Sequence, residues 1–375
     1  MKARVRTCVV AAILTLAALW PVAAGAQTAI PGPCVDGTLP SGALSRICKP
    51  LLGYNQQLVV FAHGYVPDSP VPVPVFANLT INGVYLPDLV QSFGFAFATT
   101  TYRKNGIAIL EGMEDIRELA TQFTTLHGPP LRTFATGASE GGLVATLLIE
   151  RHPDEFNAGL AACGPVGSFR GQVNYIGDFR VLFDYFFPDV IPGNAVDVDP
   201  AILPFWETVY VPAIKDALLA NMPRALELMR VARAPYNPAD FSTVIQTAVS
   251  ALSYNVFAGR DLETALGGNP YGNLLRLYLG SSNDLRLNLR VQRFAPSLSA
   301  LAGLTPYETN GHLTRRLVTL HTTGDELVPF SHEPLYLAKV LFSGHSGLVP
   351  LPVARYGHCN FTGPEILTAF ALTVQ

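Results

Sequence analysis

Charged residues are scarce in this sequence. Asp, Glu, Lys and Arg make up only 14% of its 375 residues, and the formal net charge is -3. Without an excess of positive charge, the chain has no electrostatic attraction to nucleic acid or to an anionic membrane, so we expect neither as a partner. Disorder is excluded as well. Hydrophobic residues make up 49% of the chain, a composition that folds around a large core.

Motifs that bind metals and cofactors are also lacking. The sequence has no His-Glu-x-x-His pair, no phosphate-binding loop with a lysine and no dinucleotide fingerprint. We therefore expect no metal and no cofactor. No feature of the sequence indicates an oligomeric state.

Long hydrophobic runs are nearly absent. The one candidate, residues 8–20, follows a basic start and precedes the small residues of positions 24–26. This order is typical of a secretory signal peptide, so we expect residues 1–26 to be removed and the mature chain to begin at Gln27. The alternative is an uncleaved anchor, but the run is short for a membrane span, which needs about 20 residues. The sequence thus predicts a secreted or periplasmic protein without stable membrane insertion.

Cysteines are few, and their number fits this compartment. Removal of the signal peptide takes Cys8 away and leaves Cys34, Cys48, Cys163 and Cys359. An even number of cysteines in an exported chain indicates two disulfides. Of the three connectivities, we favour Cys34–Cys48, which closes a short loop, together with Cys163–Cys359. Free buried thiols are the alternative.

The order of apolar segments predicts an α/β fold. Short runs without polar alternation are typical of parallel strands covered on both faces, and helical periodicity fills the gaps between them. We expect one core made of residues 27–163 and 312–375, with a mainly parallel sheet. The predicted strands are 57–62, 93–99, 131–136, 158–163, 316–321 and 351–355, and the predicted helices are 110–126, 141–151, 334–342 and a last one from Pro364.

Residues 164–311 follow a different pattern. They show no alternation of strand and helix, they begin with an aromatic-rich stretch, and two segments within them (211–232 and 239–258) have apolar stripes at helical spacing. We interpret this part as a mainly helical insertion, a cap that covers the C-terminal edge of the sheet.

The segment Gly137-Ala138-Ser139-Glu140-Gly141 lies between a predicted strand and a predicted helix. A G-x-S-x-G motif in this context makes a turn so tight that the serine is strained and its hydroxyl is presented at the helix N-terminus. Ser139 is therefore the candidate nucleophile. The alternative is a serine that only caps the helix.

A serine hydroxyl needs a base to remove its proton, and the base needs a carboxylate to orient it. His358 follows the last predicted strand and Asp325 follows the strand before it, so both are expected at the edge that carries Ser139. His321 lies inside its strand and is expected to be buried. Glu326, next to Asp325, is the competitor for the role of the acid.

The negative charge of a tetrahedral intermediate must be held by backbone N–H groups. One should come from Glu140, the residue after the nucleophile. The other should come from the loop after the first predicted strand, His63-Gly64-Tyr65, in which we favour Tyr65.

Together these segments resemble the α/β-hydrolase superfamily over nearly the whole mature chain. GASEGG is similar to its nucleophile elbow, HGY to its oxyanion loop, TGDELVP to its acid turn and GHC to its base loop. The resemblance implies a catalytic triad of Ser139, Asp325 and His358. Cys359 is similar to a cysteine of tannases and feruloyl esterases that is bonded to one just before the serine. Here that position is Ala138, and Cys163 is the candidate replacement.

The expected reaction is hydrolysis of a small or polymeric carboxylic ester, as by a carboxylesterase or lipase. Tyr175, Phe179 and Phe183 in the cap are candidates for the substrate pocket, although they could instead form the cap's own core. A secreted peptidase of the prolyl-oligopeptidase-like kind is the alternative function. A non-catalytic binding protein is disfavoured, because all members of the triad are present.

Overall fold

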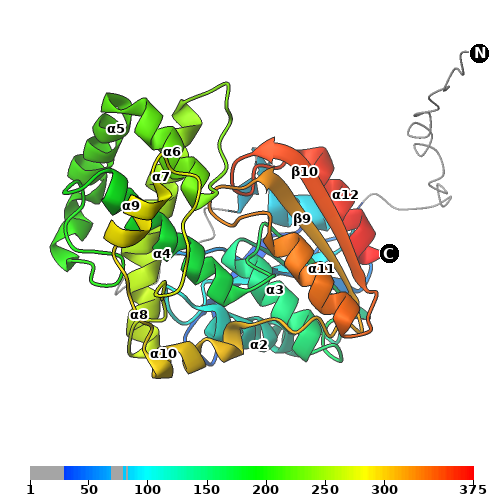
Figure 1. Cartoon of the computed structure of the whole chain (residues 1–375). Coiled ribbons are helices and arrows are strands. Elements are labelled where there is room, and N and C mark those ends of the chain that lie inside the picture. Colours follow the sequence, from blue (N-terminus) through cyan, green and yellow to red (C-terminus); the bar gives the residue numbers. More distant parts are fainter. Residues whose placement is uncertain (1–28, 69–78, 82) are drawn as a thin grey trace, which may run out of the picture.

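A central eight-stranded sheet organises the protein (Figure 1). The computed structural model describes residues 29–68, 79–81 and 83–375, so the predicted signal peptide lies outside it. In spatial order the strands are β1 (Cys34–Thr38), β2 (Leu44–Cys48), β6 (Ala96–Thr100), β3 (Gln57–Ala62), β7 (Arg132–Ala138), β8 (Ala158–Ala162), β9 (Arg316–Gly324) and β10 (Leu348–Tyr356). In this order β1, β2 and β6 pair antiparallel, and all neighbouring strands from β6 to β10 are parallel.

Successive residues of each strand pack on opposite faces of this sheet. In β3, Leu58 and Val60 face the helices α2 (Ile109–His127), α3 (Glu140–Arg151) and α11 (His332–Phe342), while Val59 faces α1 (Leu86–Ser92) and α12 (Gly363–Val374). Helices on both faces explain why the strands are apolar throughout. The strand order and the parallel direction are those of the α/β-hydrolase fold, and this expectation is confirmed.

The N-terminal edge of the sheet was not predicted. Strands β1 and β2 form a hairpin in which Cys34 pairs with Cys48, and the disulfide between these two residues closes it. A second small hairpin consists of β4 (Thr80–Ile81) and β5 (Val84–Tyr85).

Between β8 and β9, a stretch that the structure describes in full, the chain forms helices and no strand. We call residues 164–311 the cap, which lies beside the sheet in green to yellow in Figure 1. The cap has its own hydrophobic core around Trp206, which is separate from the two layers on the sheet. Its α-helices are α4 (Phe169–Phe186), α5 (Val211–Ala220), α6 (Met222–Ala232), α7 (Ser242–Tyr254), α8 (Arg260–Leu266), α9 (Asp284–Arg290) and α10 (Leu298–Gly303).

The helix predicted over 211–232 is divided into α5 and α6. Asn221 leaves the helical conformation, and its side chain accepts the N–H of Arg224 as the N-cap of α6. A side chain that satisfies the first N–H groups of a new helix stabilises a break at that point. No helix among the described residues is long and apolar enough to cross a membrane.

Candidate active site

Ser139 lies alone between the end of β7 and the start of α3. Its backbone has φ 57 and ψ -124, a conformation that non-glycine residues rarely adopt. The flanking glycines make this turn possible. A Cβ on Gly137 would lie 2.1 Å from the carbonyl oxygen of Gly141, and one on Gly141 would lie 2.0 Å from that of Ala62. The sequence motif therefore forms the strained strand–turn–helix that presents a nucleophile.

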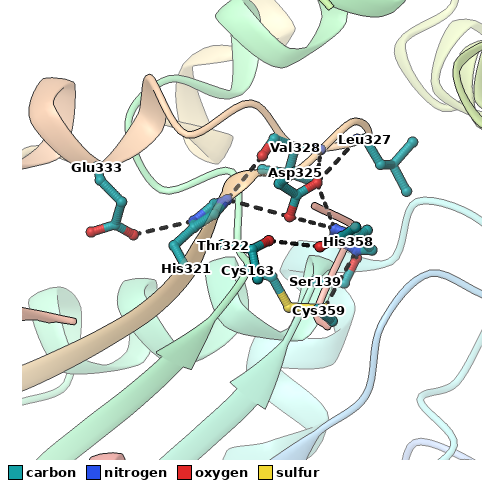
Figure 2. The surroundings of a disulfide bond; sticks show 11 residues. Ser139, Cys163, His321, Thr322, Asp325, Leu327, Val328, Glu333, His358 and Cys359 are labelled. Atoms are coloured by element: carbon teal, nitrogen blue, oxygen red, sulfur yellow. Dashed lines mark hydrogen bonds and ion pairs between the residues drawn. A yellow bond between two sulfur atoms is a disulfide. The ribbon is translucent and has the colours of Figure 1, made fainter. Parts of the chain in front are cut away.

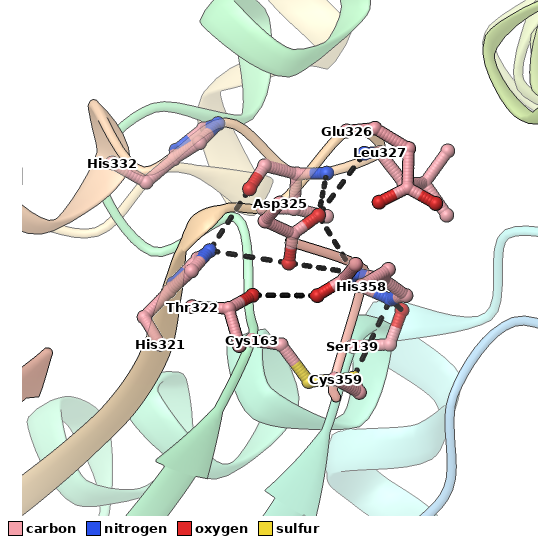
Figure 3. A network of polar contacts seen from close by, with 12 residues as sticks. Ser139, Cys163, His321, Thr322, Asp325, Glu326, Leu327, His332, His358 and Cys359 are labelled. Carbon is pink, nitrogen blue, oxygen red and sulfur yellow. Dashed lines mark hydrogen bonds and ion pairs between the residues drawn. A yellow bond between two sulfur atoms is a disulfide. The ribbon is translucent and has the colours of Figure 1, made fainter. Parts of the chain in front are cut away.

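Three loops bring Ser139, His358 and Asp325 together at the C-terminal edge of the sheet (Figure 3). The Oγ of Ser139 lies 2.9 Å from Nε2 of His358. On the other side of the imidazole, Nδ1 lies 2.8 Å and 3.0 Å from the two carboxylate oxygens of Asp325. These distances allow proton transfer from the hydroxyl to the imidazole, with the carboxylate fixing the tautomer.

Asp325 is fully buried and held by its own loop. Its Oδ1 accepts the backbone N–H groups of Leu327 at 3.0 Å and Val328 at 2.8 Å. Burial alone would raise the pKa of this carboxyl, but His358 and His321 outweigh burial and hold the pKa well below its usual range. Asp325 is therefore an anion at neutral pH and stabilises a positive charge on His358.

Glu326 does not contact the imidazole. Its carboxylate accepts a hydrogen bond from Gln246, and its backbone carbonyl accepts the hydroxyl of Tyr175 at 2.7 Å. In Figure 3 no interaction joins Glu326 to His358. Of the two adjacent acids, the structure thus places Asp325 in the triad position.

His321 supports Asp325 from behind, a role that the sequence did not reveal. Its Nε2 lies 2.9 Å from the carbonyl of Val328 and 3.4 Å from Asp325, and its Nδ1 lies 3.3 Å from Glu333. Burial opposes a charge on this ring, but hydrogen bonds to Asp325 and Glu333 raise its pKa to about 9. Because both ring nitrogens face acceptors, His321 is an imidazolium.

The loop that carries His358 is attached to the sheet from two sides (Figure 2). The disulfide Cys163–Cys359 joins it to the end of β8. The hydroxyl of Thr322, in β9, donates a hydrogen bond of 2.6 Å to the carbonyl of Gly357. Both predicted disulfides are thus present, and the second fixes the residue next to the candidate base.

The predicted oxyanion loop lies against the nucleophile. A Cβ on Gly64 would lie 3.1 Å from the Cβ of Ser139, so only glycine allows this approach without a shift. Among the described residues, no protein acceptor takes a hydrogen bond from the backbone N–H of Tyr65 or of Glu140. Within the part of the chain that the structure describes, both N–H groups are thus available as the predicted donors.

A cavity opens at Ser139 between the core and the cap. Its wall is largely apolar, so it suits an apolar substrate group. Residues that line it include Ile107, Ile109, Phe169, Val173, Ile176, Val196, Val198 and Tyr254.

The predicted pocket residues do not line the cavity. Phe179 and Phe183 are fully buried in the core of the cap, and Tyr175 donates its hydroxyl to Glu326. The cavity is instead lined by the face of α4 that carries Val173 and Ile176. All five residues have helical spacing, and only the packing of α4 decides which face meets the cavity.

The side chain of Glu140 is an unexpected component of the cavity wall. It is buried, its Oε1 accepts the N–H of Ala108 at 2.9 Å, and its Oε2 has no partner among the described residues. Burial raises its pKa to about 8, more than the Ala108 N–H lowers it. Glu140 is therefore a neutral acid at pH 7.

The side chains of Tyr65 and Tyr254 were also missed. Tyr65 donates its hydroxyl to the carboxylate of Asp261 in α8, and its ring contacts that of Tyr254. Tyr254 lines the cavity together with Ser139. Nothing in the local sequence marks Tyr254 or Asp261, because these two cap residues reach the site only through tertiary packing.

No protein-family model matches the sequence, and no curated protein matches it either. Solved structures with a similar fold include an acylaminoacyl peptidase of Pyrococcus horikoshii (14% identity, TM-score 0.43, 88% of this chain and 38% of that chain). An esterase of Pyrococcus furiosus has 12% identity and a TM-score of 0.45 over 90% of this chain and 88% of its own. A putative dipeptidyl aminopeptidase IV of Bacteroides ovatus has 12% identity and a TM-score of 0.45 over 92% and 36%. The chain spans less than half the length of either peptidase.

Proposed function

We propose that this protein is a serine hydrolase that cleaves carboxylic esters through an acyl-enzyme on Ser139. The observation that carries the proposal is the continuous chain of contacts from Ser139 through His358 to Asp325, with distances of 2.9 Å and 2.8 Å, at the mouth of an apolar cavity.

The geometry supports a two-step reaction. As Oγ of Ser139 bonds to the ester carbonyl carbon, His358 takes the hydroxyl proton. The carbon–oxygen bond to the alcohol then breaks, and His358 gives the proton to the leaving oxygen. Water repeats the sequence on the acyl-enzyme and releases the acid. The backbone N–H groups of Tyr65 and Glu140, together with the N-terminus of α3, stabilise the oxyanion in both steps.

The cavity supports an ester with an apolar acyl or alcohol group. Its wall is formed largely by aliphatic and aromatic side chains, and Glu140, the acid nearest to the nucleophile in sequence, is neutral at pH 7. Binding is favoured by about 25 cal/mol of free energy for each Å² of apolar substrate surface that the wall removes from water. This binding energy would be available to a hydrophobic ester.

A serine peptidase of the prolyl-oligopeptidase-like kind is the competing proposal. The same triad would serve it, and the charged side chains of Arg260 and Glu263 also line the cavity. Such charges could bind the charged terminus of a peptide. An assay must therefore compare esters with peptide substrates.

Export to the periplasm or the medium is part of the proposal. The two disulfides support it, because disulfides persist in oxidising compartments. The signal peptide remains a prediction from the sequence.

The test is hydrolysis of p-nitrophenyl esters of short and long acyl chains beside dipeptidyl and tripeptidyl anilides. We expect ester turnover by the purified protein and a loss of about 10⁴- to 10⁶-fold in kcat for Ser139→Ala. Efficient cleavage of the anilides with negligible ester activity would contradict the proposal and favour the peptidase. Ester turnover that survives in Ser139→Ala would contradict both.

A further inference from the structure

One segment of the cap exposes most of its leucines. Residues 273–293 include α9, and six of their seven leucines are between 56% and 97% exposed. By contrast, the polar residues Asn273 and Tyr278 of the same segment are buried. We call the six exposed leucines the leucine face, and they are Leu274, Leu275, Leu277, Leu279, Leu285 and Leu289. Single exposed leucines are ordinary, but a group of this size indicates an interaction surface.

Hydrogen bonds fix the backbone that carries the leucine face. The backbone N–H of Tyr278 donates to Oδ1 of Asn288 at 3.0 Å, and Nδ2 of Asn288 donates to the carbonyl of Tyr278 at 2.7 Å. The guanidinium of Arg293 donates to the carbonyls of Asn273 at 2.8 Å and Arg276 at 2.6 Å. The polar side chains of the segment thus bind its own backbone, and the leucines are left to face outward.

The same hydrogen bonds bring two groups of leucines together. Both neighbours of Tyr278 in the sequence are exposed leucines. Leu285 and Leu289 are one turn apart on α9, so they share one side of this helix, next to Asn288. Because Tyr278 is bonded to Asn288, the two groups are neighbours on the surface and form one apolar face.

Positive charge accompanies the leucine face. Residues 273–293 contain four arginines and one acidic residue, Asp284, which gives a local net charge of +3 in a chain of -3. Arg286 and Arg290 directly follow Leu285 and Leu289 and are exposed. Within the described part of the chain, no ion pair joins either arginine to an acid. Their charges are therefore available to a partner outside the protein.

We propose that the leucine face docks this protein on the surface of an anionic phospholipid bilayer. Leucines beside arginines fit the two layers of such a surface, because the leucines enter the acyl region and the guanidiniums bind lipid phosphates. A second copy of the chain fits less well. In a symmetric pair the same arginines would face each other, and like charges disfavour that contact.

The total charge of the chain gives no attraction to a membrane, so docking depends on where the arginines lie. The leucine face also follows closely on Asn269, Pro270 and Tyr271, which line the cavity at Ser139. A docked protein would thus hold the cap wall of this cavity near the lipid. Docking itself needs no catalysis, and the inference goes beyond the proposed function.

The test is co-sedimentation of the purified protein with phosphatidylcholine vesicles that contain about 30% phosphatidylglycerol, at low ionic strength. We expect binding that decreases as salt is added, because salt screens the arginines. In Leu277→Gln/Leu289→Gln the apparent partition coefficient should fall by at least about tenfold. In Arg286→Gln/Arg290→Gln binding should weaken and lose most of its dependence on salt.

Two leucines of the sheet core provide the matched control. Leu126 and Leu131 are 60% and 70% exposed and are remote in sequence from the cap. Binding of Leu126→Gln/Leu131→Gln should stay within about twofold of the wild type. Circular dichroism checks that every variant is folded. Ser139→Ala should bind the vesicles as the wild type does, so failure of the proposed function would leave this result unchanged.

Four results would overturn the inference. The wild type could fail to sediment with the vesicles, which would leave the face to a protein partner. Equal binding to pure phosphatidylcholine would contradict the role of the arginines, and an equal loss in the control pair would contradict a specific face. A wild-type dimer in analytical ultracentrifugation that dissociates in Leu277→Gln/Leu289→Gln would assign the face to a second copy.

Discussion

Asp325 and Glu326 are adjacent acids, but they have different roles in the candidate site. Asp325 and Glu326 are both buried, but only Asp325 reaches His358. The backbone N–H groups of Leu327 and Val328 bind its Oδ1 and fix it in place. The loop therefore selects the acid through its own hydrogen bonds.

Substitution of the two acids by their amides should give unequal losses. In Asp325→Asn an amide replaces the carboxylate, so His358 is held in the wrong tautomer and kcat should fall by about 10⁴-fold. In Glu326→Gln, kcat for the same ester should stay within a few-fold of the wild-type value. Steady-state kinetics of both variants provides the measurement. A larger loss in Glu326→Gln would reverse the assignment.

The buried acid of Glu140 predicts a pH-dependent stability. An unfolded glutamate loses its proton near the ordinary pKa of 4.5, whereas the folded protein keeps the Glu140 proton up to about pH 8. Between these values the folded state binds the extra proton. The free energy of unfolding should therefore fall as pH rises, by up to about 1.4 kcal/mol per pH unit for this group.

Urea denaturation from pH 4.5 to pH 8.5 measures this effect. The difference in stability between the wild type and Glu140→Gln should shift in favour of the variant as pH rises. The exposed Glu207→Gln substitution is the control, and its difference from the wild type should be constant. A constant difference for Glu140→Gln as well would rule out a proton held by this side chain.

At the scale of elements, the two disulfides join very different parts of the fold. Cys34–Cys48 closes a hairpin at the edge of the sheet, with 14 residues of separation. Cys163–Cys359 spans 196 residues and connects the end of β8 to the loop that carries His358. The first is remote from the triad, and the second touches its base loop.

Removal of each pair by double alanine substitution should separate stability from activity. Each loss should cost about 2–4 kcal/mol, with the larger cost for Cys163–Cys359 because it closes the longer loop. Only Cys163→Ala/Cys359→Ala should also lower kcat, since His358 loses one of its two attachments. Chemical denaturation and ester kinetics of both variants provide the comparison. Equal activity losses would contradict a special role of the second bridge.

Helix α4 shows how far an element can be predicted. Its aromatic side chains and helical spacing place it in the cap, and both features are visible in the sequence. Its orientation is not, because residues 175, 179 and 183 and residues 169, 173 and 176 form two apolar faces of comparable character. Tertiary packing buries Phe179 and Phe183 in the cap core and leaves Phe169 and Val173 at the cavity, while Ile176 contacts both.

At the scale of the whole molecule, the protein consists of a sheet core with the catalytic loops and a cap with a separate hydrophobic core. The chain enters the cap after β8 and returns to β9. The chain leaves β8 at the edge that carries Ser139 and enters β9 at the opposite edge, where Arg316 pairs with Ala158. The cap lies over the candidate site because residues of the cap line the cavity at Ser139. Its helices supply much of the cavity wall, including the side chain of Tyr254.

The parallel sheet, the turn at Ser139 and the order of the triad follow from the amino-acid sequence. These features depend on short-range chemistry: apolar runs form buried strands, and only glycine allows the contacts around Ser139. The side chains of α4 that meet the cavity and the contacts of Tyr254 and Asp261 were decided by tertiary structure alone. They depend on how segments more than a hundred residues apart rotate and pack against each other, and no local pattern records that rotation.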